Sequence, residues 1–262
     1  MSGNNAEVSL EDIVSLCKRR GFVFQGSEIY GGLAGTWDYG PLGVTLKKKL
    51  MDLWWKTFVE ERDDIVGVDA AILMNPKTWQ ASGHVDTFTD PLFKNIVNHR
   101  RHSTDHILTD NGVDADGMTV KEMDEIIAEK DIKSPDGNPL SKSRKFNLMY
   151  ETVSGPVAND ENKVYIRPET AQGIFTNFKN VVDTLYPEIP FGIAQTGKAF
   201  RNEISPRDFV FRSREFEQME IEYFIKESDW EKLFEQWRED IKSFLNDAGV
   251  DTSSVYELEV PE

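Results

Sequence analysis

Arginines, a carboxylate and aromatic rings lie close together in the sequence near residue 200. Phe200-Arg201-Asn202-Glu203 is followed by a short polar stretch, residues 204–208, and then by Phe211-Arg212-Ser213-Arg214-Glu215-Phe216. Guanidinium groups hold phosphates, a flat ring stacks on a base, and a carboxylate accepts a hydrogen bond from an amine. These residue types together suit a nucleoside triphosphate. A hairpin with a charged outer face is the alternative, and the pattern alone leaves both open.

Two antiparallel strands would position these side chains. Each flank alternates in character, and the connection contains Pro206 and other residues that favour turns. A hairpin would bring Arg201, Glu203 and Arg212 within reach of one ligand, together with Phe216. The return strand continues to Phe224, with Gln218, Glu220 and Glu222 on one face and Met219, Ile221 and Tyr223 on the other. Such a row of carboxyl groups either faces water or lines a cation-binding cleft.

A second polar turn precedes the hairpin. Arg167-Pro168-Glu169-Thr170 follows a strand expected over 164–166 and leads into a helix that ends near Leu185. Arg167 and Glu169 stand at the mouth of this turn, where a polar ligand could meet them. They could equally be a helix cap and a surface charge.

Hydrophobic periodicity and turn residues predict the remaining elements. Residues 21–43 are dense in glycine and aromatics, and they form either a packed irregular loop or a loop that lines a site, without the spacing of a phosphate-binding loop. Residues 77–94 are expected to form a structured loop. Three further helices are expected: one capped by Ser9, one over 41–62, and one that begins at a capping box of Ser228 with Glu231 and ends at Gly249. The expected strands cover 66–74, 146–150, 190–197 and 254–260.

Residues 95–144 differ in composition from the rest of the chain, because they are rich in glycine, proline and charged residues. We predict that they form an insertion with one helix over 119–130. Three of the four histidines, His99, His102 and His106, lie there beside Asp105. Because no cysteine and no second ligand pair accompany them, we interpret them as a solvated loop and predict no metal site.

Composition fits an ordinary globular protein, with 39% hydrophobic and 29% charged residues among 262. A single cysteine, Cys17, excludes an internal disulfide and fits a reducing compartment. No secretion signal and no stretch long enough to span a membrane is recognisable, so cytoplasm is expected. The net charge of −16 argues against bulk attraction to nucleic acid, although a local basic patch stays possible.

Several uncommon motifs occur in one order. From about Leu10 to Phe244, and least over 95–144, the chain resembles glycyl-tRNA synthetases of the dimeric, single-polypeptide class II kind. The motifs that carry the resemblance are Glu28 to Gly32, Asp38 to Gly43, Met74 to Trp79, Ser82 to His84, Arg167 to Gly173 and Phe200 to Phe216. The resemblance implies an α+β fold, an antiparallel sheet flanked by helices and incomplete at the C-terminus.

The resemblance also implies an activity: ATP-dependent conversion of glycine to glycyl-adenylate and its transfer to tRNA(Gly), with Mg²⁺ expected. Arg201 would bridge the α-phosphate and the substrate carboxylate, and Arg212 would hold the folded-back β- and γ-phosphates. Glu203 would fix the adenine end, and Phe216 would stack on adenine. The implied ATP-binding set is Arg201, Asn202, Glu203, Phe211, Arg212 and Phe216, and the implied glycine-binding set is Glu169, Arg201 and Glu220.

The chain departs from the resemblance by what it lacks. The third class II signature, with its arginine, and the anticodon-binding domain are absent, so we expect a catalytic-domain fragment that is weakly active or inactive alone. Its expected parts are 1–94 with a dimerisation signature, 95–144 as insertion, and 145–262 with the ATP hairpin. The glycine-rich segment and helix 41–62 imply a homodimer.

Two other functions are considered. One is a synthetase-like accessory protein that binds nucleic acid without catalysis; retention of the arginines and carboxylates together argues against it. The other is a class II synthetase for another small amino acid, which the pair Glu169 and Glu220 disfavours.

Overall fold

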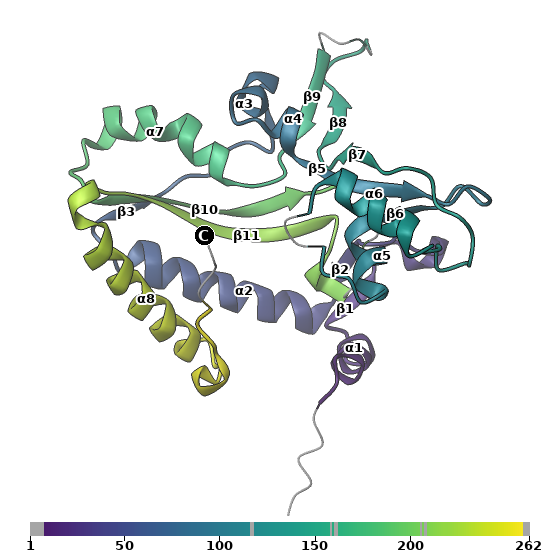
Figure 1. Cartoon of the computed structure of the whole chain (residues 1–262). Coiled ribbons are helices and arrows are strands. Elements are labelled where there is room, and N and C mark those ends of the chain that lie inside the picture. Colours follow the sequence, from purple (N-terminus) through teal and green to yellow (C-terminus); the bar gives the residue numbers. More distant parts are fainter. Residues whose placement is uncertain are drawn as a thin grey trace, which may run out of the picture.

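A long antiparallel hairpin forms the centre of the molecule (Figure 1). The computed structural model describes residues 8–115, 118–157, 159, 162–204, 206 and 209–258. Strands β10 (Phe191–Phe200) and β11 (Glu215–Phe224) pair along their whole length, and β3 (Ile65–Gly67) runs parallel to β10. The predicted hairpin is therefore confirmed, and the mixture of helices and largely antiparallel sheets confirms the α+β class.

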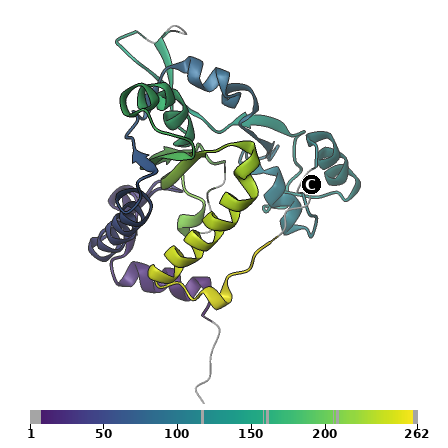
Figure 2. The same cartoon turned by 90° about the vertical axis from the view of Figure 1, so that its left-hand side faces the viewer.

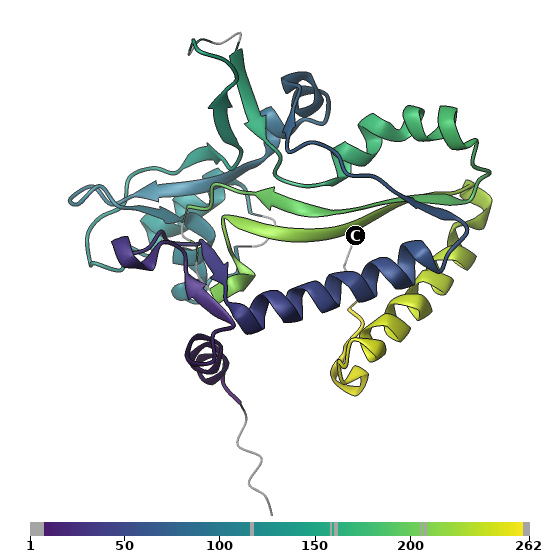
Figure 3. The ribbon, with the colours of Figure 1, turned by 180° about the vertical axis from the view of Figure 1, so that it is seen from behind.

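Helices cover both faces of this sheet. Helix α2 (Pro41–Trp55), extended by a π-helical turn (Lys56–Glu60), and α8 (Trp230–Asp247) pack on one face, as Figure 2 shows. Helix α7 (Ala171–Leu185) packs on the other face, visible from behind in Figure 3. Met219, Ile221 and Tyr223 contact the core under α2 and α8, so the predicted division of the β11 faces is confirmed, and Glu220 and Glu222 lie on the α7 side.

The N-terminal elements follow their local sequence. Helix α1 (Leu10–Arg19) begins at Ser9, whose side chain forms a capping box with Asp12, which confirms the predicted cap. Strands β1 (Val23–Gln25) and β2 (Trp37–Tyr39) pair with each other across a short 3-10 helix (Glu28–Tyr30). The glycine-rich segment is thus a small packed hairpin.

The strand expected over 66–74 is wrong, because two short strands of different sheets divide this run. After β3 the N–H of Val68 still donates to the carbonyl of Ala194, and then the chain leaves the central sheet. Strand β4 (Leu73–Met74) joins β9 (Lys163–Ile166), which pairs with β8 (Tyr150–Val153). A continuous apolar run cannot reveal such a change of partner.

Residues 77–94, expected as a loop, form helices α3 (Pro76–Ala81) and α4 (His84–Thr87) and strand β5 (Thr89–Lys94). Asn75 caps α3 by accepting from the N–H of Lys77 at 3.0 Å. Proline is favoured in the first turn of a helix, so Asn-Pro here begins an element as well as ending a strand. The sequence pattern alone indicated the second of these meanings and not the first.

Strand β5 pairs with β6 (Arg101–Ser103) and with β7 (Arg144–Asn147), so a three-stranded sheet underlies the region that reads as an insertion. The predicted helix is α6 (Val120–Glu129), capped by Thr119. The expectation of a single helix is wrong, because α5 (Thr104–Asp110) precedes it. These elements surround a core of their own, formed by Phe93, Ile107, Leu108, Val113, Ala115, Met123, Ile127 and Ile132. We call β5, β6, α5, α6 and this core the inserted unit, after the predicted insertion 95–144, which contains all of these elements except β5.

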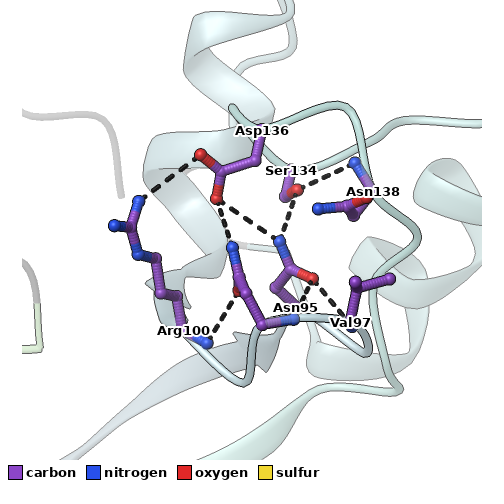
Figure 4. A network of polar contacts seen from close by, with 7 residues as sticks. Asn95, Val97, Arg100, Ser134, Asp136 and Asn138 are labelled. Carbon is purple, nitrogen blue, oxygen red and sulfur yellow. Dashed lines mark hydrogen bonds and ion pairs between the residues drawn. The ribbon is translucent and has the colours of Figure 1, made fainter.

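A buried amide holds the loops of the inserted unit together (Figure 4). Asn95 is 0% exposed; its Nδ2 donates to Ser134 Oγ at 2.9 Å, and its Oδ1 accepts from the N–H of Val97 at 2.9 Å. Asp136 accepts from Asn98 Nδ2 at 2.6 Å and pairs with Arg100. The satisfied network gives the unit a defined shape.

Two expectations near the C-terminus are wrong. No capping box joins Ser228 to Glu231, because a 3-10 turn (Glu227–Asp229) precedes α8 and Ser228 Oγ donates to Asp229. Residues 252–254 form a 3-10 helix, and 255–258 form no strand; the rest of the expected strand lies outside the described residues. Within the described ranges, no helix has the length and apolar character needed to cross a membrane.

Candidate functional site

A pocket of about 450 Å³ opens where the central hairpin ends. It contains five of the six residues predicted to bind ATP; the backbone N–H of Asn202, the sixth, donates to the carbonyl of Leu148 at 2.7 Å. The sequence did not point to the pocket residues Phe88, Asp90 and Leu148, which lie just before β5, in β5 and just after β7. The lining comprises Phe88, Asp90, Leu148, Arg201, Glu203, Phe211, Arg212, Ser213 and Phe216.

The polar residues lie in the connection between the strands rather than on the strands. The N–H of Arg201 donates to the carbonyl of Arg214 at 2.9 Å, and beyond this pair the two chain segments separate. Glu203 and Arg212 therefore lie beyond the regular ladder, on a longer connection than the predicted 204–208. Residues 205, 207 and 208 are outside the described part of this connection.

Arg212 is surrounded by acceptors. Its Nε donates to Glu203 Oε2 at 2.8 Å, and its Nη2 donates to Asp90 Oδ2 at 3.2 Å. Its Nη1 contacts His106 Nε2 of the inserted unit. Burial and the neighbouring Asp105 raise the pKa of the Asp90 carboxyl, and Arg212 opposes that rise. The carboxyl groups of the pocket thus compete for one guanidinium.

Arg201 lies between two aromatic rings. Its guanidinium carbon is 5.3 Å from the ring centre of Phe88 and 5.2 Å from that of Phe216. Its Nε donates to the carbonyl of Pro168 at 3.2 Å. Cation–π contacts of this kind orient an arginine. Arg201 therefore joins the pocket to the Pro168–Thr170 turn.

Arg214 supports the pocket from behind, a role that the sequence did not reveal. Its guanidinium donates to the carbonyls of Glu203 and Ala34. Gly35 has φ +72°, and a Cβ added there would lie 2.5 Å from Pro206 Cβ. The glycine-rich segment is thus a packed support for the hairpin connection, and none of its residues lines the 450 Å³ pocket.

A second cluster, of carboxyl groups, lies between β11 and the start of α7. Thr170 Oγ1 donates to Glu220, and the N–H of Thr170 donates to Gln218 Oε1 at 3.1 Å. Burial raises the pKa of Glu222, and the charges of Glu220 and Glu169 raise it further. The structure therefore brings the two predicted glycine-binding carboxylates together, in an environment that favours a small cation.

His84 joins this cluster from α4. Its Nε2 is 3.3 Å from Glu169 Oε1, and its Nδ1 is 2.8 Å from Ser82 Oγ. The imidazole packs against the rings of Trp79 and Phe88. Only the Ser-Gly-His motif pointed to it in the sequence. Among the described residues, no group of three or more His, Cys, Asp and Glu side chains has an arrangement that could hold a metal ion.

Arg167 does not face a ligand, contrary to one reading of its turn. It is 2% exposed, and its Nε and Nη1 donate to the carbonyls of Lys198 and Ala70 at 2.7 and 2.8 Å. Burial lowers its pKa. The side chain fastens the turn to the central sheet, so Glu169 rather than Arg167 is available to the cluster.

Residues 151–260 match the family described as tRNA synthetase class II core domain (G, H, P, S and T). The glycine–tRNA ligase of Geobacillus thermodenitrificans (strain NG80-2) is 49% identical over 255 residues, which cover 94% of this chain and 55% of that protein. The glycine–tRNA ligase of Bacillus anthracis is 49% identical with 94% and 56% covered. The chain spans about half the length of these curated relatives.

A solved structure shares the fold. The RNA binding domain of threonyl-tRNA synthetase from Cryptosporidium parvum Iowa II superposes with a TM-score of 0.55 at 15% identity, covering 89% of this chain and 42% of that chain. At this identity the likeness concerns the fold alone. Residues 151–260 thus match a class II tRNA synthetase core, and 94% of this chain aligns with a glycine–tRNA ligase at 49% identity.

Proposed function

We propose that this chain supplies the part of a glycine–tRNA ligase that binds ATP and glycine and joins them as glycyl-adenylate. The observation that carries the proposal is the position of Arg201. It lines the 450 Å³ pocket and also contacts the Pro168 carbonyl, next to Glu169. One guanidinium thus lies between a nucleotide-sized pocket and a cluster suited to an ammonium group.

The reaction needs charge stabilisation more than proton transfer. A carboxylate oxygen of glycine attacks the α-phosphorus of ATP, a new P–O bond forms, and the bond to pyrophosphate breaks. Because the glycine carboxylate is already ionised, no base is required. Arg201 would neutralise the charge that develops on the α-phosphate, and Arg212 would hold the β- and γ-phosphates.

The carboxylate cluster would select the amino acid. Glu169 and Glu220 would accept hydrogen bonds from the glycine ammonium group. Thr170, which is fully buried, holds Glu220 in place and would form part of a wall around the ammonium group. A wall at that position excludes the methyl group of alanine by its volume, which is the means left when the substrate has no side chain to bind.

Magnesium would enter with the phosphates of ATP. The pocket carboxylates Asp90 and Glu203 both accept from Arg212, so they do not form a cage of their own for the ion. Mg²⁺ usually binds through substrate phosphates and water with few protein ligands. The residues present therefore fit a metal held by the substrate, and no protein side chain is assigned to it.

The further partners follow from the same proposal. The complete ligase would transfer glycine to tRNA(Gly) in the cytoplasm, as a homodimer. Ile29 and Tyr30 are each 87% exposed, and apolar side chains of α2 such as Leu46 are also exposed. An apolar surface of this kind is typical of an interface. It supports the expected dimer contact through the glycine-rich segment and α2.

Pyrophosphate exchange, measured on the complete gene product with each of the twenty amino acids, tests the proposal. Exchange that depends on glycine, with alanine and serine near background, is expected. Exchange with another small amino acid instead would identify a synthetase of different specificity. No exchange with any amino acid, although the protein is folded, would favour the non-catalytic alternative.

A further inference from the structure

Three elements supply the acceptors around Arg212. Glu203 belongs to the hairpin connection, Asp90 to β5 and His106 to α5. Each of the three guanidinium nitrogens has a partner from a different element. The planar fork is therefore fixed in both direction and rotation, which one or two partners would leave freer.

The contact with His106 also determines the form of that histidine. A guanidinium group has five N–H donors and no acceptor, so Nε2 of His106 must accept the hydrogen bond from Arg212 Nη1. The imidazole in this contact is neutral, with its proton on Nδ1. His106 thus acts toward Arg212 as a neutral acceptor, beside the two carboxylates of Glu203 and Asp90.

The positions of His106 and Asp90 depend on the core of the inserted unit. His106 is followed in α5 by Ile107 and Leu108, which are 3% and 0% exposed, and β5 carries the buried Phe93 three residues after Asp90. These apolar side chains belong to one packed cluster. The helix and strand that hold Arg212 are therefore anchored on the far side by close packing.

We propose that His106 and Asp90 are positioning residues for Arg212, through which the inserted unit sets the phosphate end of the nucleotide pocket. The inference rests on the proposed role of Arg212 in holding the β- and γ-phosphates. Neither residue needs to touch the phosphates for this effect. A guanidinium that is not held in place must be ordered when the nucleotide binds, and the entropy lost in that ordering weakens nucleotide affinity.

Nucleotide affinity distinguishes a positioning role of His106 from a role in folding alone. The dissociation constants of ATP and AMP, measured by calorimetry with Mg²⁺ on the complete gene product, report the contribution of the β- and γ-phosphates as a ratio. His106→Ala is expected to raise the ATP constant about 10-fold and to leave the AMP constant nearly unchanged, since the substitution removes a hydrogen bond to a charged group. Wild-type protein should bind ATP more tightly than AMP.

Two conservative variants make the test independent of packing. His106→Gln places an amide oxygen near the position of Nε2 and should restore most of the ATP-over-AMP preference. His106→Asn reaches only the position of Nδ1 and should behave like His106→Ala, even if the alanine variant is too unstable to measure. His99, an exposed histidine of the same unit at φ +62°, provides the control His99→Asn, which should match wild type.

An unchanged ATP-to-AMP ratio in both His106→Ala and His106→Asn would overturn the inference. Equal weakening of ATP and AMP would also overturn it, because the effect would then be a loosened pocket. Wild-type protein with no preference for ATP over AMP would also overturn it, because Arg212 would then not hold the β- and γ-phosphates. Failure of the proposed function would be seen in a different measurement, as wild-type protein that supports no glycine-dependent pyrophosphate exchange. The ratio of the ATP and AMP dissociation constants would still decide the role of His106.

Discussion

Arg212 donates from Nε to Glu203 Oε2 at 2.8 Å, so the group proposed for the phosphate end of ATP and the group proposed for its adenine end form one ion pair. A nucleotide that uses both must bring its terminal phosphates back beside its base. The geometry therefore supports a bent ATP, the conformation that the resemblance implies. An extended triphosphate would leave one of the two residues unused.

The charge of Glu203 leads to a prediction about base selection. A carboxylate accepts from the amine of adenine and repels the carbonyl oxygen of guanine, whereas an amide can donate to that oxygen. Glu203→Gln should therefore lower the preference for ATP over GTP by about 10-fold, the value of a single hydrogen bond with a charged group. The measurement is glycine-dependent pyrophosphate exchange with each nucleotide.

The matched control for Glu203→Gln is Glu217→Gln. Glu217 lies on β11 and pairs with Lys47 rather than with a pocket residue. Its substitution should leave the ATP-to-GTP ratio unchanged. If Glu203→Gln also leaves the ratio unchanged, the adenine end of the nucleotide does not lie beside Glu203.

Arg201 leads to a prediction about rate. Arg201→Ala should reduce glycine-dependent exchange by about 10²- to 10³-fold, the usual effect of removing one donor to the transition state. The fold should persist, because the substitution removes a hydrogen bond to one carbonyl and the packing on two rings at the edge of the pocket. Far-UV circular dichroism checks the fold. Retained activity would show that the proposed role is wrong.

Glu220 leads to a prediction about glycine. Glu220→Gln keeps an acceptor for Thr170 but removes a charge from the proposed site of the glycine ammonium group. The KM for glycine should rise about 10- to 100-fold, with the KM for ATP nearly constant, because hydrogen bonds with charged groups contribute that much. Steady-state exchange at varied glycine and ATP separates the two constants. Parallel increases in both would place Glu220 outside the amino-acid subsite.

Sequence predicted the elements around this site correctly where neighbouring residues alone determine the local structure. The hairpin, the alternating faces of β11 and the cap at Ser9 depend on neighbours in sequence, and each is confirmed. The run over 66–74 was not resolved into β3 and β4, because which strand pairs with which depends on tertiary contacts.

The candidate site shows the same division. The motif around Arg201 and Arg212 led directly to the residues that line the pocket. Asp90 and His106 could not be found this way, since they lie more than one hundred residues away in sequence and reach Arg212 only through the fold of the inserted unit. A histidine in a charged loop has no local feature that distinguishes a solvated position from a buried contact.

Tyr223 leads to a prediction about stability at high pH. Its hydroxyl donates to Asp64 Oδ2 at 2.5 Å, and burial together with that carboxylate raises its pKa to about 12. Because the folded state favours the protonated phenol, the contribution is fully present below the ordinary value of 10 and is lost as the pH rises through about 12. The free energy of unfolding of Tyr223→Phe should approach that of wild type over this range.

Urea denaturation of both proteins at several pH values measures this difference. Near neutral pH the loss in Tyr223→Phe should be on the order of 1 kcal/mol, the net value of one hydrogen bond. Titration of lysines and other tyrosines affects both proteins alike and cancels in the comparison. A difference that does not change with pH would show that the phenol contributes through packing alone.

Gly197 of β10 tests the buried arginine beneath the site. A Cβ at this position would lie 2.4 Å from Nη2 of Arg167, whose side chain is held by the carbonyls of Lys198 and Ala70 and cannot move aside freely. Gly197→Ala should therefore lower the free energy of unfolding by about 1–3 kcal/mol, the cost of overpacking.

The control is Gly112→Ala, where φ is +72° and the added atom meets open space. It should lower the free energy of unfolding by about 1 kcal/mol through backbone strain and leave glycine-dependent exchange intact. Because Arg167 holds the turn that carries Glu169, Gly197→Ala should in addition raise the KM for glycine. An unchanged KM would show that the turn keeps its position without Arg167.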